Sequence, residues 1–258
     1  MYRPNALKQN LKAGRNVVGC WTMLGNPHAL EILALAGYDY LLLVLEHGIG
    51  DPSSLATMLM AISATKTTSV VRVPWNDHVY LKRVLDAGAE GVMIPSIETA
   101  EEARAAVAAC RYPLAGRRGT AASSVRASSY GMGQDYVATA ADNLLIVLQI
   151  ESAKGVQNID EILKVEGIDV VFIGPYDLSA TVGRMGDLKH PDVAGMIETV
   201  EKKAKAANIP LGTVPHTGVP WMEMFKRGYQ FVNSSSDVAK LRESSLAEVK
   251  TFREAYPR

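Results

Sequence analysis

The sequence is poor in cysteine, in net charge and in long apolar stretches, and each shortage excludes a class of protein. Cys20 and Cys110 are the only cysteines among 258 residues, and each lies within an apolar helix or strand pattern. Two isolated cysteines of this kind are expected to be reduced core residues, which favours a cytoplasmic setting. No spacing typical of a cysteine-based zinc site is present.

Charge and hydropathy exclude two further kinds of partner. The 27 basic and 27 acidic side chains give a formal net charge of +0, so no basic field is available for nucleic acid or an anionic membrane. No apolar run reaches the roughly 18 residues of a membrane span. Residues 1–16 are polar and lack the apolar core of a signal peptide. We therefore expect a globular cytoplasmic protein with small-molecule partners.

Eight short apolar runs alternate with amphipathic segments along the chain. The runs predict strands over 17–23, 40–46, 68–74, 91–96, 144–151, 169–175, 209–215 and 230–236. The segments predict helices over 27–37, 51–64, 77–88, 99–112, 158–165, part of 191–207, 219–228 and 237–256. This alternation is typical of βαβ units and a parallel sheet, and eight units in about 250 residues predict a (β/α)8 TIM barrel.

A doubly wound sheet is the competing fold, but its usual Gly-rich phosphate turn is missing after the first run, at 21–30. Residues 113–143 form a long Gly-, Ser- and Arg-rich insertion, and loops of that length are usually functional or make contacts. Its Arg117, Arg118 and Arg126 could bind an anion, contact a neighbouring subunit or simply be solvated. Because no linker separates these segments, we predict one domain over 1–258.

Barrel active sites lie at the C-terminal ends of the strands, so polar residues at those ends form the candidate site. They are Glu46, His47, Arg72, Gln149, Glu151, Gly174, Pro175 and Asp177. Glu151 and Asp177 are two carboxylates on adjacent strands, which suit a hard divalent cation that keeps waters, such as Mg2+ or Mn2+. Alternatively, either carboxylate could cap the helix that follows it.

Arg72 and His47 supply the remaining chemistry. Arg72 lies inside an apolar run, where a buried arginine needs an anionic partner. That partner could be Asp86 on the following helix or the carboxylate of a substrate. His47 follows a strand end, which favours acid/base catalysis over a solvated loop histidine. His216 follows the seventh run and could line the mouth of the site.

Long motifs in this order resemble the HpcH/HpaI aldolase family, the metal-dependent pyruvate aldolases. The matching stretches are EHG at 46–48, VRVPWND at 71–77, LKRVLDAGAEGVMIP at 81–95, ACRYPLAGRRG at 109–119, LQIES at 148–152 and FIGPYDLSATVG at 172–183. Within the family the chain most resembles the hydroxypyruvate-using and 2-keto-3-deoxy-sugar-acid aldolases.

The resemblance implies a role for each matching residue. Glu151 and Asp177 would bind the divalent metal, Mg2+ or Mn2+ with Co2+ or Zn2+ as further candidates. Arg72 would hold the keto oxygen of the substrate, and His47 would be the acid/base residue. Asp86 would join the site from a neighbouring subunit. The residues that would help to seat the pyruvyl group are Gln149, Gly174, Pro175 and Tyr176.

The resemblance also implies an assembly and exposes one departure. It implies a modified barrel whose last helix is exchanged between partner subunits, giving dimers that form a hexamer, and the amphipathic tail after Asp237 is compatible with this. The family usually has Asp two residues before the Glu of EHG, where it pairs with the histidine. Here that residue is Val44, which accepts no hydrogen bond and cannot orient the ring. Val44 and Glu46 are thus expected to lie next to the catalytic side chains and not to contact the substrate themselves.

We therefore expect a class II aldolase, a carbon–carbon lyase that reversibly adds pyruvate or hydroxypyruvate to an aldehyde to form a 4-hydroxy-2-oxo acid. A Schiff-base aldolase needs a buried Lys at a strand end, and the predicted strands contain none. Lys154 lies just past Glu151, in a segment expected to be exposed. Two alternatives stay open: an acyl-CoA lyase or thioesterase on a related barrel, and a metal- and 2-oxo-acid-binding protein whose catalysis is impaired by Val44.

Overall fold

Eight parallel strands close into a barrel in chain order, each bonded to the next and the last bonded back to the first. This computed structural model describes residues 2–216 and 218–257. The strands are β1 Val17–Thr22, β2 Tyr40–Val44, β3 Thr68–Arg72, β4 Gly91–Ile94, β5 Leu145–Ile150, β6 Val170–Ile173, β7 Leu211–Thr213 and β8 Phe231–Ser236. The predicted barrel of alternating strands and helices is confirmed.

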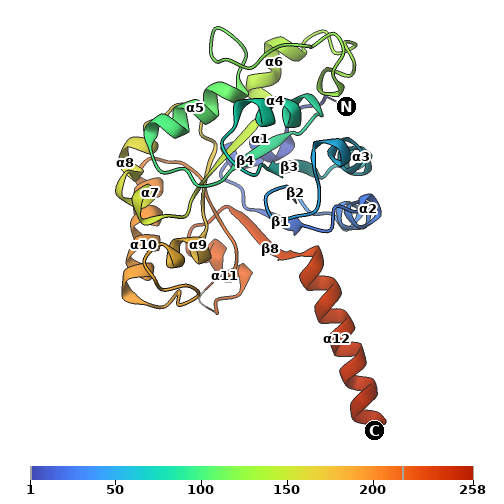
Figure 1. Ribbon diagram of the computed structural model, residues 1–258, viewed down its shortest axis with the longest axis vertical. Coiled ribbons are helices and arrows are strands. Elements are labelled where there is room, and N and C mark those ends of the chain that lie inside the picture. Colours follow the sequence, from blue (N-terminus) through green and yellow to red (C-terminus); the bar gives the residue numbers. More distant parts are fainter. Residues whose placement is uncertain (1, 217, 258) are drawn as a thin grey trace.

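Helices surround the barrel, as Figure 1 shows. They are α1 Ala6–Lys12, α2 Pro27–Leu35, α3 Pro52–Ser63, α4 His78–Asp86, α5 Ala100–Cys110, α6 Tyr136–Asn143, α7 Ala153–Gln157, α8 Ile159–Ile162, α9 Pro175–Ala180, α10 Pro191–Ala206, α11 Trp221–Lys226 and α12 Asp237–Ala255, with a 3-10 turn at Arg126–Ser128. Within the described ranges, no helix is both long enough and apolar enough to cross a bilayer.

Local sequence explains where the outer helices begin. Asp51 accepts hydrogen bonds from the main chain of Ser53 and Ser54 and forms a capping box at α3. Thr99 and Glu102 form a second capping box at α5. Such reciprocal bonds satisfy main-chain N–H groups that the first turn of a helix leaves unpaired.

Two apolar layers result from the alternation of side chains along each strand. Residues that point outward pack against the helices, and both Cys20 and Cys110 belong to this outer layer. Both thiols are buried and free, as the sequence predicted, and burial raises the pKa of Cys20 to about 11. Residues that point inward fill the barrel, where Tyr40 stacks on Phe231 with ring centroids 4.0 Å apart.

The N-terminal end of the barrel is closed by charged pairs and by α1, whose Leu7 and Leu11 belong to the interior layer. An acidic residue precedes each of β2, β4 and β6 and accepts a main-chain N–H from the strand before it. These pairs are Asp39 with Val18 at 2.8 Å, Glu90 with Ser69 at 2.9 Å and Asp169 with Ile146 at 2.9 Å. This end is therefore structural, and the opposite end is left open for a site.

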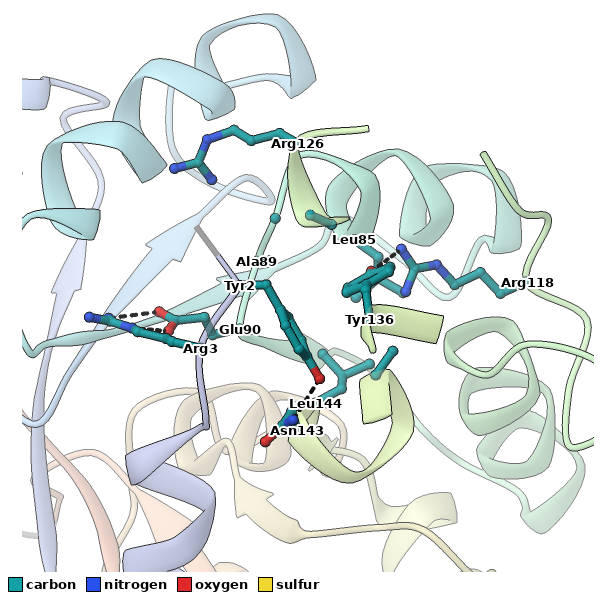
Figure 2. A pocket seen from close by; sticks show the side chains of 13 residues that line it. Tyr2, Arg3, Leu85, Ala89, Glu90, Arg118, Arg126, Tyr136, Asn143 and Leu144 are labelled. Atoms are coloured by element: carbon teal, nitrogen blue, oxygen red, sulfur yellow. Dashed lines mark hydrogen bonds and ion pairs between the residues drawn. The ribbon is translucent and has the colours of Figure 1, made fainter. Parts of the chain in front are cut away.

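The insertion at 113–143 folds over α4 and the start of β4 (Figure 1). Arg118 is buried there, lies over the Tyr112 ring at 4.6 Å and donates to the Tyr136 hydroxyl at 2.9 Å. Figure 2 shows Arg118 and Tyr136 pointing toward one another in a small pocket that Tyr2 and Asn143 also line. Of the three alternatives left open for these arginines, solvation is wrong for Arg118, because this side chain is part of the packing of the insertion.

The last helix, α12, leaves the barrel and extends away from it in Figure 1. Its exposed apolar side chains are Val238, Leu241, Leu246, Val249 and Phe252. Its first residue, Asp237, is buried and accepts from the main-chain N–H groups of Met23 and Leu24, so the helix is fixed to the β1 end of the barrel at its base.

Candidate active site

A cavity of about 560 Å3 opens at the C-terminal ends of the strands. Its lining includes Trp21, His47, Arg72, Gln149, Asp177 and Asn233. A second hollow beside it is lined by Glu46, Glu151 and Ser96, and it shares His47 and Asp177 with the first. The structure thus brings together the polar residues that the sequence placed at the ends of the second, third, fifth and sixth strands.

Glu151 follows β5 directly and is almost fully buried. Its Oε1 accepts the main-chain N–H of Ser96 at 2.8 Å, and its Oε2 accepts from the amide of Gln149. Burial raises the pKa of Glu151 to about 7; the carboxylates of Asp177 and Glu46 add to this, while the Ser96 bond and Arg72 oppose it. Ionisation of Glu151 at this position therefore costs free energy, which a nearby positive charge would offset.

Neither of the two carboxylates caps a helix, so the capping alternative is wrong. Ser152, not Glu151, caps α7 by accepting from Gly155. Gly174 is the N-cap residue of α9, which has no side-chain cap from any residue that the structure describes, and Asp177 lies in the first turn of this helix. Neither carboxylate is therefore engaged at a helix end, and both line the second hollow, which shares His47 and Asp177 with the cavity.

The two carboxylates fit a divalent cation with oxygen ligands. A Cβ at Gly174 would lie 2.5 Å from Glu151 Oε2, so glycine at this position leaves the room that the carboxylate occupies. Among the described residues, no group of three or more His, Cys, Asp and Glu side chains is arranged to hold a metal. Two carboxylates are nevertheless enough for a hard ion such as Mg2+, which keeps water or substrate oxygens in its other positions.

Arg72 ends β3 with its side chain inside the barrel mouth. Its guanidinium lies over the ring of Trp21, 4.8 Å from the centroid, and its Nε donates to Glu46 Oε2 at 2.5 Å. The suggested pairing of Arg72 with Asp86 is therefore wrong. The stacked and paired guanidinium is a fixed positive charge on the wall of the cavity.

His47 is largely exposed at the rim, where its Nε2 lies 3.8 Å from Glu46 Oε1. Val44 is buried at the end of β2 and pairs in register with Arg72. Because Val44 offers no acceptor, Glu46 is the carboxylate that faces both Arg72 and His47. Their arrangement permits proton exchange between solvent and a ligand in the cavity.

Asp86 does not reach the site of its own chain. It ends α4, five residues before the start of β4, and therefore lies toward the closed end of the barrel. Its Oδ1 accepts from Arg118 at 2.8 Å. A contribution of Asp86 to a neighbouring subunit stays a prediction. The same bond engages Arg118, one of the arginines that an acyl-CoA phosphate site would have used.

The sequence suggests that His216 could line the mouth of the site, but it is not among the residues that line the cavity. It is buried, and its Nδ1 lies 2.8 Å from the carbonyl oxygen of Val214, one of the residues that do line the cavity.

Three further residues of the site were not predicted from the sequence: Trp21, Asn233 and Ser96. Ser96 has a φ of 54°, a left-handed conformation that non-glycine residues adopt rarely and that often accompanies function.

A parallel eight-stranded barrel with a carboxylate pair, a buried arginine and a histidine at one mouth is the layout of a barrel enzyme acting on a small anionic substrate. Comparison with known families agrees with that class. The family model described as HpcH/HpaI aldolase/citrate lyase matches residues 17–244, and the chain belongs to this family. It is an aldolase, a carbon–carbon lyase.

Individual relatives match over nearly the whole chain. The 5-keto-4-deoxy-D-glucarate aldolase of Salmonella paratyphi A is 41% identical over 250 residues, which are 97% of this chain and 97% of that protein. A crystal structure of a family protein from Burkholderia cenocepacia has a TM-score of 0.93 and 37% identity, covering 96% of this chain and 99% of that one. An HpcH/HpaI aldolase from Desulfitobacterium hafniense has a TM-score of 0.89 and 33% identity, covering 98% of each chain. The family resemblance is confirmed.

Proposed function

We propose that this protein is a class II aldolase that reversibly joins pyruvate or hydroxypyruvate to an aldehyde and cleaves 4-hydroxy-2-oxo acids. The observation that carries the proposal is the carboxylate pair Glu151 and Asp177, which lines one hollow, beside Arg72, which lines the adjoining cavity together with Asp177. The 41% identity to a 5-keto-4-deoxy-D-glucarate aldolase supports a sugar-acid substrate.

Glu151 and Asp177 would hold the divalent metal, Mg2+ or Mn2+ in the first instance. When bound, the metal supplies Lewis-acid polarisation of the carboxylate and keto oxygens of a 2-oxo acid. Gln149 donates to Glu151 and keeps that carboxylate in place. Together with Gly174, Pro175 and Tyr176, which line the same wall, it would seat the pyruvyl group.

Arg72 stabilises the charge that the reaction creates. In the cleavage direction the C3–C4 bond breaks, and its electron pair passes toward the keto oxygen to form an enolate. A preorganised guanidinium at that oxygen stabilises the enolate more than the neutral ketone. Trp21 and Glu46 hold the guanidinium in place, so little reorganisation is needed when the charge develops.

His47 would move the protons. It would accept the proton of the C4 hydroxyl as the aldehyde leaves, and a proton returned to C3 of the enolate completes pyruvate. Its exposure at the rim lets the ring exchange protons with solvent between turnovers. Glu46 lies close enough to His47 to stabilise the charged ring, the role that the family gives to the Asp replaced here by Val44.

We also infer that α12 is exchanged between two copies of the chain and that these dimers assemble into a hexamer. The exposed apolar side chains of α12 support this, because an isolated amphipathic helix would leave them in water. The test is the mass in solution of a Leu241→Glu, Val249→Glu double variant. Dissociation to a smaller species is expected, and an unchanged mass would contradict the exchange.

The test of the activity is a metal-dependence experiment with pyruvate and an aldehyde. EDTA should abolish aldol formation, and added Mg2+ or Mn2+ should restore it. Asp177→Asn should lose the response to metal, while Asp160→Asn, at an exposed pair far from the cavity, should keep it. Full activity in EDTA with borohydride trapping of pyruvate would instead show a Schiff base and defeat the proposal.

A second measurement separates the aldolase from an impaired binding protein. Exchange of the methyl protons of pyruvate in D2O reports enolate formation without an aldehyde. Exchange together with aldol product supports the aldolase, exchange alone indicates enolisation by an impaired site, and tight pyruvate binding without exchange indicates a binding protein.

A further inference from the structure

The wall of the mouth cavity carries polar atoms that no described residue satisfies. They are Trp21 Nε1, Gln149 Oε1 and both amide atoms of Asn233. All three side chains line the same cavity. Asn233 is 1% exposed, so its amide is withdrawn from bulk solvent as well as from hydrogen bonds within the protein.

Asn233 points into the barrel because of its place in β8. Phe231, two residues earlier, belongs to the interior layer and stacks on Tyr40. Side chains alternate along a strand, so Asn233 lies on the same face and nearer the mouth. It pairs in register with Gly19 of β1, the strand that also carries Trp21. The amide therefore lies on the interior wall next to the tryptophan that supports Arg72.

The two ends of the amide define what would satisfy it. Buried polar groups without partners are costly, and in native proteins they are nearly always matched by a ligand or by ordered water. A carboxylate would use only the Nδ2 donor, and a methyl group would use neither atom. A hydroxyl group can accept from Nδ2–H and donate to Oδ1, so it matches both.

The depth of Asn233 indicates which substrate carries that hydroxyl. The 2-oxo acid is the inner substrate, since it must reach Arg72, Gln149 and the carboxylate pair. An aldehyde adds from the open side, where the cavity is lined by Ser236, Ala239 and Glu243 at the start of α12. A buried group on the interior wall therefore faces the 2-oxo acid, and the part of that molecule which varies is its C3 substituent.

We propose that Asn233 is a specificity-determining residue that hydrogen-bonds the C3 hydroxyl of a 3-hydroxy-2-oxo acid, so that the site prefers hydroxypyruvate to pyruvate. This inference rests on the proposed aldolase function and names the substrate class of the same site. Ordered water held by Asn233, with no role in selection, is the competing occupant of the same position.

The test compares two donors in one assay with a common aldehyde and saturating Mg2+. In Asn233→Leu, which keeps the size but removes both polar atoms, kcat/KM for hydroxypyruvate should fall roughly tenfold to a hundredfold. For pyruvate it should change by less than about threefold, because pyruvate has no hydroxyl for the amide to bind. Asn233→Ala is the second variant and should shift the same ratio if the leucine does not fold.

Asn10→Leu, the same change on α1 at the closed end, is the matched control and should leave the ratio of the two donors unchanged. Equal effects of Asn233→Leu on both donors, or none on either, would overturn the inference while leaving the aldolase function intact. If the wild-type protein turns over neither donor, the proposed function fails instead. Calorimetry in the presence of Mg2+ then decides the inference by measuring the affinities for hydroxypyruvate and pyruvate. The inference is overturned if the difference between these two affinities is the same in Asn233→Leu as in the wild-type protein.

Discussion

Arg72 donates through Nε to Oε2 of Glu46 at 2.5 Å, and this bond joins the second residue after β2 to the last residue of β3. The other oxygen of Glu46 lies 3.8 Å from His47 Nε2. One carboxylate thus stands between the residue assigned to the keto oxygen and the residue assigned to the proton. With Val44 unable to accept a bond, Glu46 couples the two functional groups in this chain.

Glu46→Gln should lower kcat/KM for the aldol reaction while largely preserving the fold. The amide can still accept from Arg72, but it no longer fixes the guanidinium by charge or stabilises a protonated His47. We expect a loss of roughly tenfold, smaller than the roughly 10²–10³ that loss of a direct oxyanion donor costs. Steady-state kinetics check this, with Glu46→Asp as the charge-conserving control. Wild-type kcat in the Gln variant would show that Glu46 positions neither group.

Val44→Asp should raise kcat and change metal affinity little. The new carboxylate would lie beside Arg72 in the register of β2 and β3, so its buried charge would have a partner. It would restore the acceptor that the family usually provides for the histidine, while Glu151 and Asp177 stay untouched. Val44→Asn, of the same shape without the charge, is the control. A flat kcat in Val44→Asp, measured beside a metal titration, would refute a role for this position.

The barrel could be predicted from the sequence, but the exact ends of its strands and its N-terminal helix could not. Alternating apolar and amphipathic segments fix the number of βα units. An apolar run does not reveal where inter-strand bonding stops, so the run at 209–215 contains only Leu211–Thr213 as β7. The sequence does not predict α1, because polar residues dominate the N-terminal segment. Only the spacing of Leu7 and Leu11 indicates the turn of helix that closes the barrel.

The site could be predicted from strand ends and motifs, but its pairings could not. The sequence offers Asp86 as a candidate partner for Arg72 because it lies on the helix that follows this strand. α4 runs back toward the closed end, however, and takes Asp86 to Arg118. Asn233 lies within the strand predicted over 230–236, but the residues of this run do not indicate which of its faces points into the barrel. Its interior position follows only from the register of β8, which the sequence does not show.

Asp169→Ala should destabilise the barrel without affecting the site. Asp169 Oδ2 accepts from Lys8 Nζ and from the main chain of Ile146, both at 2.9 Å, at the closed end. Removing one partner of a buried pair leaves the other charge uncompensated, so we expect a loss of about 3 kcal/mol and a Tm lower by roughly 6–12 °C. Thermal unfolding measures this.

The control for Asp169→Ala is the exposed pair of Lys203 and Asp160. Asp160→Ala should cost no more than about 1 kcal/mol, because water solvates both charges. Adding Lys8→Met to Asp169→Ala should recover part of the lost stability, since the double variant leaves no unpaired charge. Equal losses for Asp169→Ala and Asp160→Ala would show that the closed end does not depend on the buried pair.

His216 should make the fold less stable in mild acid. Burial lowers the pKa of this histidine, with Arg227 acting in the same direction and the Val214 carbonyl and Glu201 opposing it. The unfolded chain takes up the proton near its ordinary pKa of about 6.5, so below that pH it binds more protons than the folded chain. The contribution of His216 is therefore complete above about pH 6.5 and is lost as the pH falls below that value. Urea unfolding at several pH values between about 5 and 8 gives the free energy of unfolding as a function of pH. This free energy should depend less steeply on pH in His216→Asn than in wild type, whereas the exposed-site variant His28→Asn should match wild type. A wild-type slope in His216→Asn would assign the acid sensitivity to other groups.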